Sequence, residues 1–173
     1  MFFNAIRALQ DSHVLGMNSR NASFISKYNK RSQYPLADNK VLTKAHAQEV
    51  GVPVPNLYGL VSTVGDLKNI LTLLKPYSSF VIKPAHGSGG EGVLVLEQPE
   101  PGVFIRSSGA SLSLPDLRLH VANILHGLFS LGGQDDVAMV EYKVEFAEEF
   151  TDITYRGVPD IRLIVFLGIP VMA

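Results

Sequence analysis

The sequence has no cysteine, few charged side chains and no long apolar run, and each absence excludes a class of protein. Without cysteine, the 173-residue chain has neither a disulfide scaffold nor thiolate chemistry, which agrees with a cytoplasmic location. No apolar run approaches the ~20 residues that cross a bilayer, so no membrane association is expected. Acidic and basic residues nearly balance, at 16 and 15, so no strong field favours nucleic acid.

The rest of the composition is that of a folded domain, with 46% hydrophobic residues to bury a core. Apolar residues at helical spacing predict helices over residues 1–10, from Asp38 to a stop at Gly51, from Thr63 to Pro76, and from Ser113 to Gly132 and Gly133. Short β-rich runs predict strands over residues 57–61, 80–83, 93–96, 137–142, 152–155 and 161–167. The last run is apolar enough to be buried on both faces. A mixed α+β architecture follows.

The most informative segment lies between residues 80 and 96. Residues 87–92 read Gly-Ser-Gly-Gly-Glu-Gly, and Lys83 lies on the strand that leads into them. Glycine has no Cβ, so successive backbone N–H groups can approach a phosphate, and a strand aims the lysine ammonium at anionic oxygens. The segment predicts two antiparallel strands joined by a glycine-rich phosphate flap. The alternative is a flexible hairpin loop without a ligand.

Three better-known phosphate loops do not fit this context. A Rossmann loop opens a helix, whereas residues 93–96 continue as a strand. A protein-kinase loop precedes its lysine, whereas Lys83 comes before the glycines. The Gly-Lys-Ser/Thr ending of a P-loop is absent.

The order of several short motifs along nearly the whole chain resembles the ATP-grasp superfamily. These motifs are Asp38-Asn-Lys40 with Lys44, Gly51-Val-Pro-Val-Pro55, Val81-Ile-Lys-Pro84 with the glycine-rich loop, Val140-Glu-Tyr142 and Asp160-Ile-Arg162. Within the superfamily, the sequence looks like the RimK-like α-L-glutamate ligase-related proteins, an assignment also supported by residues 15–18 and 120–133.

The resemblance implies an α+β, ATP-grasp-like fold of mixed or antiparallel sheets with flanking helices. Residues 1–56 would form an N-terminal helical segment, and residues 57–135 the small sub-domain with the glycine-rich loop. Residues 136–173 would begin a second sub-domain, which we expect to be truncated. A sheet interrupted at residues 161–173 would have an unpaired edge strand. The chain would then be less stable than its longer parent, or it would pair edge to edge with a second copy as a homo-oligomer.

The resemblance also implies a nucleotide site. Lys40 and Lys83 would contact the ATP phosphates, and Asp160 the ribose. Backbone groups of Tyr142 and Val144 and the carboxylate of Glu141 would meet the adenine. The loop contacts would be Gly87, Ser88, Gly89, Gly90 and Gly92. From the residues alone, alternatives stay open. Lys40 could be a solvated charge on a helix, and Glu141 and Asp160 could be surface acids. His86 could donate a hydrogen bond to a phosphate or be a solvated side chain.

The implied activity is that of an ATP-dependent carboxylate–amine ligase, which forms an acyl phosphate and then an amide. Its partners would be ATP with Mg²⁺ and an amino-acid or peptide substrate. The Mg²⁺ ligands are expected after Ala173, outside this chain, and no residue is assigned as catalytic. For that reason no ligase turnover is expected from these residues alone. Two alternatives are a nucleotide-binding module without catalysis and a fragment without nucleotide affinity.

Overall fold

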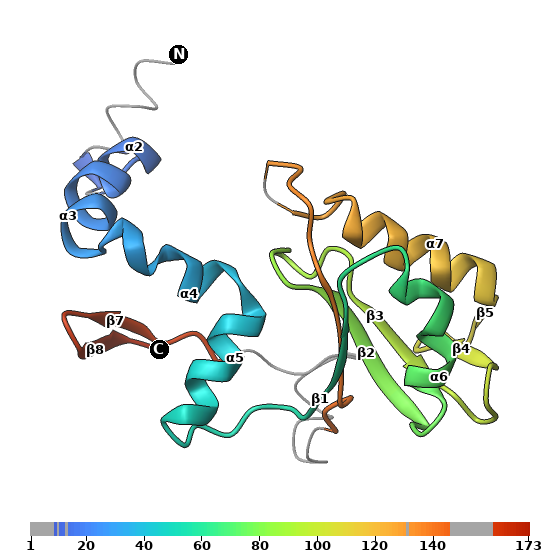
Figure 1. Cartoon of the computed structure of the whole chain (residues 1–173). Coiled ribbons are helices and arrows are strands. Elements are labelled where there is room, and N and C mark those ends of the chain that lie inside the picture. Colours follow the sequence, from blue (N-terminus) through green and yellow to red (C-terminus); the bar gives the residue numbers. More distant parts are fainter. Residues whose placement is uncertain (1–8, 10, 13, 131, 146–160) are drawn as a thin grey trace. The chain divides into compact units, whose positions relative to one another are not determined.

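A computed structural model describes residues 9, 11–12, 14–130, 132–145 and 161–173 (Figure 1). The chain divides into two compact units, one of residues 36–148 and the other of residues 1–35 with 149–173. The predicted helix over residues 1–10 lies outside the described residues except for Leu9. The predicted strand 152–155 and Asp160 lie outside them entirely. No helix in the described ranges is long and apolar enough to cross a membrane. The predicted division at residues 56 and 135 stays a prediction.

The larger unit is built on a six-stranded sheet in which all neighbouring strands are antiparallel. Phe80 lies opposite Leu96 and Ile82 opposite Leu94, so the predicted strand pair around the glycine-rich loop is confirmed. Together with the helices, this sheet confirms the α+β class, while the role of the loop as a phosphate flap stays a prediction. In sheet order the strands are β1 (Leu57–Val61), β6 (Ala138–Glu141), β2 (Ser79–Pro84), β3 (Leu94–Glu97), β4 (Phe104–Arg106) and β5 (Ser111–Leu112).

Helices α6 (Ile70–Leu74) and α7 (Leu114–Leu125) pack against one face of this sheet (Figure 1). Side chains alternate along β2, so Phe80 and Ile82 enter the core beneath these helices. Lys83 alternates with them and therefore lies on the opposite face of the sheet. The helices contribute to the core the side chains of Ile70, Leu74, Leu117, Val121 and Ile124.

The N-cap of helix α5 (Lys40–Glu49) is Asn39, one position later than Asp38, the residue from which the helix was predicted to start. Asp38 is the last residue of α4 (Tyr34–Asp38), whereas an N-cap residue needs extended backbone. Asn39 has that conformation, and its side-chain oxygen accepts hydrogen bonds from two backbone N–H groups of the first turn at 2.9 and 3.2 Å. Gly51 follows the helix with a φ of +76°, in agreement with the predicted stop.

The helix predicted from Thr63 is shorter than expected and begins as a 3₁₀ turn over Asp66–Asn69 before it continues as α6. Thr63 and Asp66, three residues apart as in a capping box, bond to each other at this start. The Asp66 carboxylate accepts hydrogen bonds from the backbone N–H groups of Ser62 and Thr63 at 3.0 and 2.9 Å. These bonds favour the ionised form and lower the pKa of Asp66.

The end of α7 differs from the prediction. The helix stops at Leu125, and not at Gly132 and Gly133. Gly127 turns the chain with a φ of +72°, and a Cβ there would lie 2.1 Å from a backbone carbonyl oxygen. Only glycine fits this close approach, so the helix must end before it. The chain then returns to the sheet as β6.

The smaller unit combines short helical turns with a β-hairpin. Phe24, Tyr28 and Phe166 form an aromatic cluster in which the rings of Tyr28 and Phe166 lie 4.9 Å apart. Edge-to-face packing of this kind links the helical turns to the hairpin. The elements are α2 (Met17–Arg20), a π-helical turn (Asn21–Ile25), α3 (Ser26–Tyr28), a 3₁₀ turn (Arg31–Gln33), β7 (Ile164–Phe166) and β8 (Ile169–Met172).

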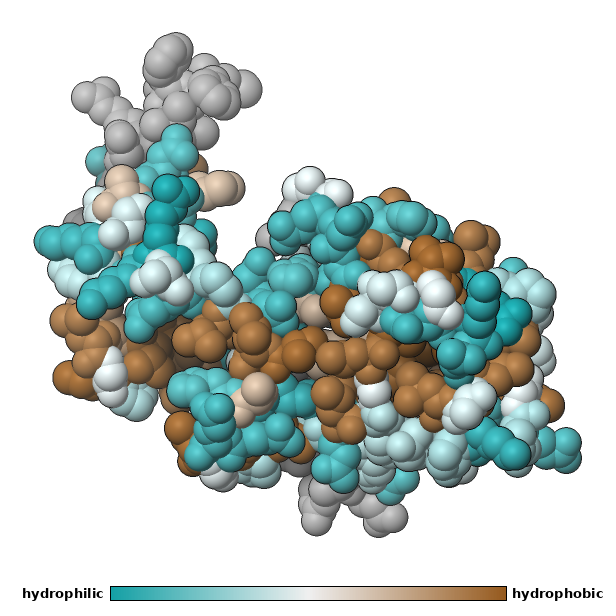
Figure 2. Space-filling view, in the orientation of Figure 1, coloured by the Kyte–Doolittle hydropathy of each residue, from teal (hydrophilic) through white to brown (hydrophobic). Residues whose placement is uncertain are grey.

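The prediction of a strand buried on both faces over residues 161–167 is wrong. Only three of these residues are in β7. The exposures of the apolar side chains in the whole segment range from 38% at Phe166 to 85% at Ile161. Among the described residues, β7 pairs with β8 alone, and the aromatic rings of Phe24 and Tyr28 meet the hairpin at Phe166. Figure 2 shows apolar side chains gathered on the surface of the hairpin. A continuous apolar run therefore does not by itself establish burial.

Candidate functional site

A glutamate and two lysines form an ionic cluster on the face of the sheet opposite α6 and α7. In the register of β2 and β6, Val81 lies opposite Glu141 and Lys83 opposite Met139. The Lys83 Nζ contacts Glu141 Oε1, and the Lys44 Nζ lies 2.8 Å from Glu141 Oε2. The side chains of Glu141 and Lys44 are 5% and 8% exposed, whereas that of Lys83 is 24% exposed. The two cations compensate a buried carboxylate, and Lys83 alone reaches solvent.

Lys44 was not among the predicted site residues, although it belongs to the motif that carries the resemblance. Its Nζ donates to the carbonyl oxygen of Pro55, so it ties α5 to the segment before β1. Its contact with Glu141 Oε2 is an ion pair without hydrogen-bond geometry, which leaves that buried oxygen with unused acceptor capacity. The spacing of four residues from Lys40, which places both side chains on one helix face, could have indicated this role.

Lys40 is attached to the glycine-rich loop and is not a solvated helix charge. Its backbone N–H donates to the Ala85 carbonyl at 3.0 Å, and its Nζ donates to the carbonyls of Ala85 and Gly87. Burial and the nearby Lys83 ammonium lower the pKa of Lys40. The Asp136 carboxylate acts in the other direction, because its charge favours the protonated form of Lys40. Two ammonium groups therefore act on each other at the start of the loop, and an anion bound there would relieve their repulsion.

The glycine-rich loop is held at both ends and exposed at its tip. Gly87 forms a β-bridge with Ser130, and a Cβ at Gly87 would lie 2.4 Å from the Pro84 ring. At Gly92, where φ is +72°, a Cβ would lie 2.7 Å from the Phe129 ring. Both positions therefore require glycine. Between them, Ser88, Gly89 and Gly90 are exposed, as contacts with a ligand would require.

Two histidines hold the loop in ways that the sequence did not indicate. The His86 side chain is only 21% exposed, and its Nδ1 lies 2.8 Å from the buried Asp136 Oδ1. The His120 Nε2, on α7, lies 3.0 Å from the Gly92 carbonyl oxygen. Both partners are distant in sequence, so no local pattern predicts these contacts.

The segment predicted to meet adenine follows β6. Tyr142 and Val144 are exposed, but the Tyr142 N–H already donates to the Asn56 carbonyl at 2.8 Å. The Glu141 carboxylate is engaged by lysines, so it is a buried ion-pair partner and not a surface acid. The predicted adenine contacts stay predictions, and Asp160 lies outside the described residues. Arg162 is exposed.

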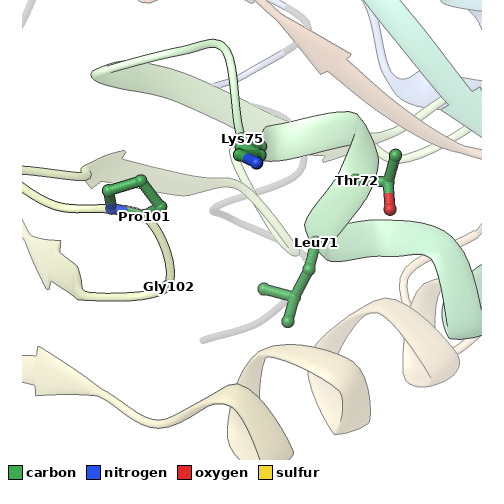
Figure 3. Close-up of a pocket in the computed structure, with 5 residues that line it drawn as sticks. All are labelled: Leu71, Thr72, Lys75, Pro101 and Gly102. Atoms are coloured by element: carbon green, nitrogen blue, oxygen red, sulfur yellow. The ribbon is translucent and has the colours of Figure 1, made fainter.

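A separate hollow of about 240 Å³ lies between α6 and the turn that joins β3 to β4 (Figure 3). It is lined by Leu71, Thr72, Lys75, Pro101 and Gly102, and it shares no residue with the ionic cluster or the loop. Lys75 is its one charged side chain, so the hollow offers little chemistry beyond a single cation.

An antiparallel sheet with a strand lysine, a glycine-rich loop after it and a second lysine on a preceding helix is the arrangement that the resemblance to the ATP-grasp superfamily implies. The family model described as sugar-transfer associated ATP-grasp matches residues 19–173, and the chain belongs to that family. This confirms the predicted superfamily and, with it, the class of ATP-binding proteins. Searches of curated proteins and of solved structures found no significant match.

Proposed function

We propose that Lys83, Lys40 and the glycine-rich loop bind the phosphates of ATP, in a protein that activates a carboxylate as an acyl phosphate. The main support is the convergence of two lysines from different elements on the start of one loop. Lys83 comes from β2 and reaches solvent, while Lys40 comes from α5 and contacts Ala85 and Gly87. Burial and, after it, the repulsion from Lys83 lower the pKa of Lys40, and this repulsion favours a bound polyanion.

These residues would bind and orient the nucleotide and take no covalent part. In the reaction that we propose, a substrate carboxylate oxygen attacks the γ-phosphorus and ADP leaves. An amine then attacks the acyl carbon, and phosphate leaves as the amide forms. The lysine ammoniums and loop N–H groups would neutralise and position the phosphates, which is the main requirement of phosphoryl transfer.

The described residues do not fit a Mg²⁺ site near the lysines. Glu141 is engaged by Lys83 and Lys44, and Asp136 by His86 and the Val137 N–H. Within the described ranges, no group of three or more metal-ligating side chains forms a cluster. Mg²⁺ would therefore arrive with ATP.

For the substrate, we propose a sugar-containing molecule that carries the carboxylate or the amine. The support is the family description, which associates these ATP-grasp proteins with sugar transfer. The RimK-like resemblance instead favours an amino acid or peptide, and it has no support beyond the motifs themselves. A cytoplasmic location and a homo-oligomer also stay predictions.

Calorimetric titration should show that ATP binds with a lower Kd than AMP, because the lysines and the loop address the β- and γ-phosphates. A parallel assay should measure phosphate release with Mg²⁺ and sugar acids or amino acids as candidate carboxylates. Binding together with release would support a ligase. Binding without release under every condition would support a nucleotide-binding module, and no binding of ATP would contradict the proposal.

A further inference from the structure

A fully buried carboxylate lies directly behind the glycine-rich loop. The Asp136 side chain has no exposed surface and accepts several hydrogen bonds. The His86 backbone N–H lies 3.2 and 3.1 Å from its two oxygens, the His86 Nδ1 lies 2.8 Å from Oδ1, and the Val137 N–H donates at 2.7 Å. Burying an isolated charge is costly, so these donors are what keep the ionised carboxylate in place.

The position of Asp136 joins three elements at one point. Its backbone N–H donates to the Leu125 carbonyl at the end of α7, and β6 starts two residues after it. Through His86 it reaches the stretch between the strand lysine and the first glycine of the loop. The carboxylate therefore ties the start of the loop to the rigid frame formed by α7 and the sheet.

Asp136 also acts on the lysine that holds the loop from the other side. Its charge favours the protonated form of Lys40, against the effects of burial and of Lys83. The charged Lys40 Nζ donates to the carbonyls of Ala85 and Gly87. At the start of the loop, the Asp136 carboxylate therefore holds the backbone N–H of residue 86. The Lys40 ammonium holds the backbone carbonyls of residues 85 and 87.

The tip of the loop lacks comparable contacts. Among the described residues, the backbone hydrogen bonds of the tip stay within it, from the Glu91 N–H to the Ser88 carbonyl and from the Val93 N–H to the Gly90 carbonyl. Ser88 to Glu91 are also exposed. A fixed start and an unattached tip are the features of a loop that closes on a ligand about a defined hinge.

From this arrangement we infer that Asp136 is a positioning residue for the phosphate site, acting through His86 and Lys40 on residues 85–87. This inference rests on the proposed function, because it assigns the loop to the β- and γ-phosphates. Asp136 would not touch the nucleotide itself. It sets where the loop begins, and therefore where the loop N–H groups and the Lys40 ammonium lie.

Asp136→Asn tests the inference, because it keeps the size of the side chain but removes the charge and places an NH₂ group where N–H donors converge. We expect the Kd for ATP to rise about tenfold or more. The Kd for AMP should stay unchanged, because AMP lacks the phosphates under the loop. Asp135→Asn makes the same change at the exposed neighbouring residue and should alter neither Kd. In the nucleotide-free protein, hydrogen exchange over residues 85–92 should accelerate in Asp136→Asn only.

A second variant covers the case in which Asp136→Asn does not fold. His86→Ala removes the ring but keeps the backbone N–H that donates to the carboxylate, and we expect a smaller rise in the ATP Kd with the same selectivity. Equal weakening of ATP and AMP, or unchanged ATP binding with unchanged loop exchange, would overturn the inference. If the wild-type chain binds neither nucleotide, the proposed function fails, and the exchange measurement alone decides whether Asp136 holds the loop.

Discussion

Replacing Glu141 with Gln is expected to destabilise the chain by about 3–5 kcal/mol, the usual cost of removing one partner from a buried ion pair. Lys44 determines most of this cost, because its side chain is only 8% exposed and its charge would be left buried without a carboxylate. The Pro55 carbonyl would remain as its acceptor but supplies no charge. Lys83 is more exposed and contributes less. Urea unfolding followed by circular dichroism measures the change directly.

Two further variants separate the ion pair from other effects of the substitution. Glu145→Gln makes the same change at an exposed position on the same connection and should leave the stability nearly unchanged. Adding Lys44→Met to Glu141→Gln should recover part of the loss, because the orphaned charge is then gone. A Glu141→Gln protein within about 0.5 kcal/mol of the wild type would show that this cluster does not need its carboxylate.

Replacing Lys83 with Met is expected to weaken ATP binding by about 1.5–3 kcal/mol, a rise in Kd of roughly 10- to 150-fold, on the scale of a charge-assisted hydrogen bond. The variant should lose less stability than Glu141→Gln, because Glu141 keeps Lys44 as its partner. Calorimetric titration with ATP measures the change in affinity, and circular dichroism establishes that the variant is folded at the temperature of the titration.

Lys68→Met is a suitable control for the loss of a lysine, since Lys68 is exposed on the 3₁₀ turn before α6. Its ATP affinity should equal that of the wild type. An unchanged affinity in Lys83→Met as well would mean that Lys83 serves only as an ion-pair partner of Glu141. The lysine on β2 would then be a structural feature, and the proposed phosphate site would lose its main cation.

The local parts of the fold could be predicted because local interactions determine them. Helix α5 ends before Gly51, the Thr63–Asp66 pair is present, and the strands on either side of the glycine-rich loop pair as expected. Lys83 could be selected because a lysine in an apolar strand needs an anionic partner. The start of α5 was one residue off, since Asp38 and Asn39 are both good N-cap residues and only the backbone conformation distinguishes them.

The contacts that complete the site depend on topology, which no local pattern reveals. β6 lies between β1 and β2 in the sheet, and this order brings Glu141 to Lys83 and Lys44. Asp136 reaches His86 across 50 residues for the same reason. The early end of α7 follows from a close approach at Gly127. The last apolar run is exposed because, in the part of the chain that the structure describes, it pairs with β8 alone. The ion pairs of Glu141 and the contact between Asp136 and His86 are therefore fixed by partners distant in the chain.

The most direct test of the phosphate site is labelling with an acyl-phosphate derivative of ATP, which transfers its acyl group to a lysine amine lying beside the bound phosphates. We expect labelling at Lys40 and Lys83, identified by mass spectrometry of the digested protein and suppressed by excess ATP. Lys40 should react readily, because its lowered pKa increases the fraction of free amine. Labelling spread evenly over exposed lysines such as Lys68, or labelling at Lys40 and Lys83 that ATP does not suppress, would contradict the proposed phosphate site.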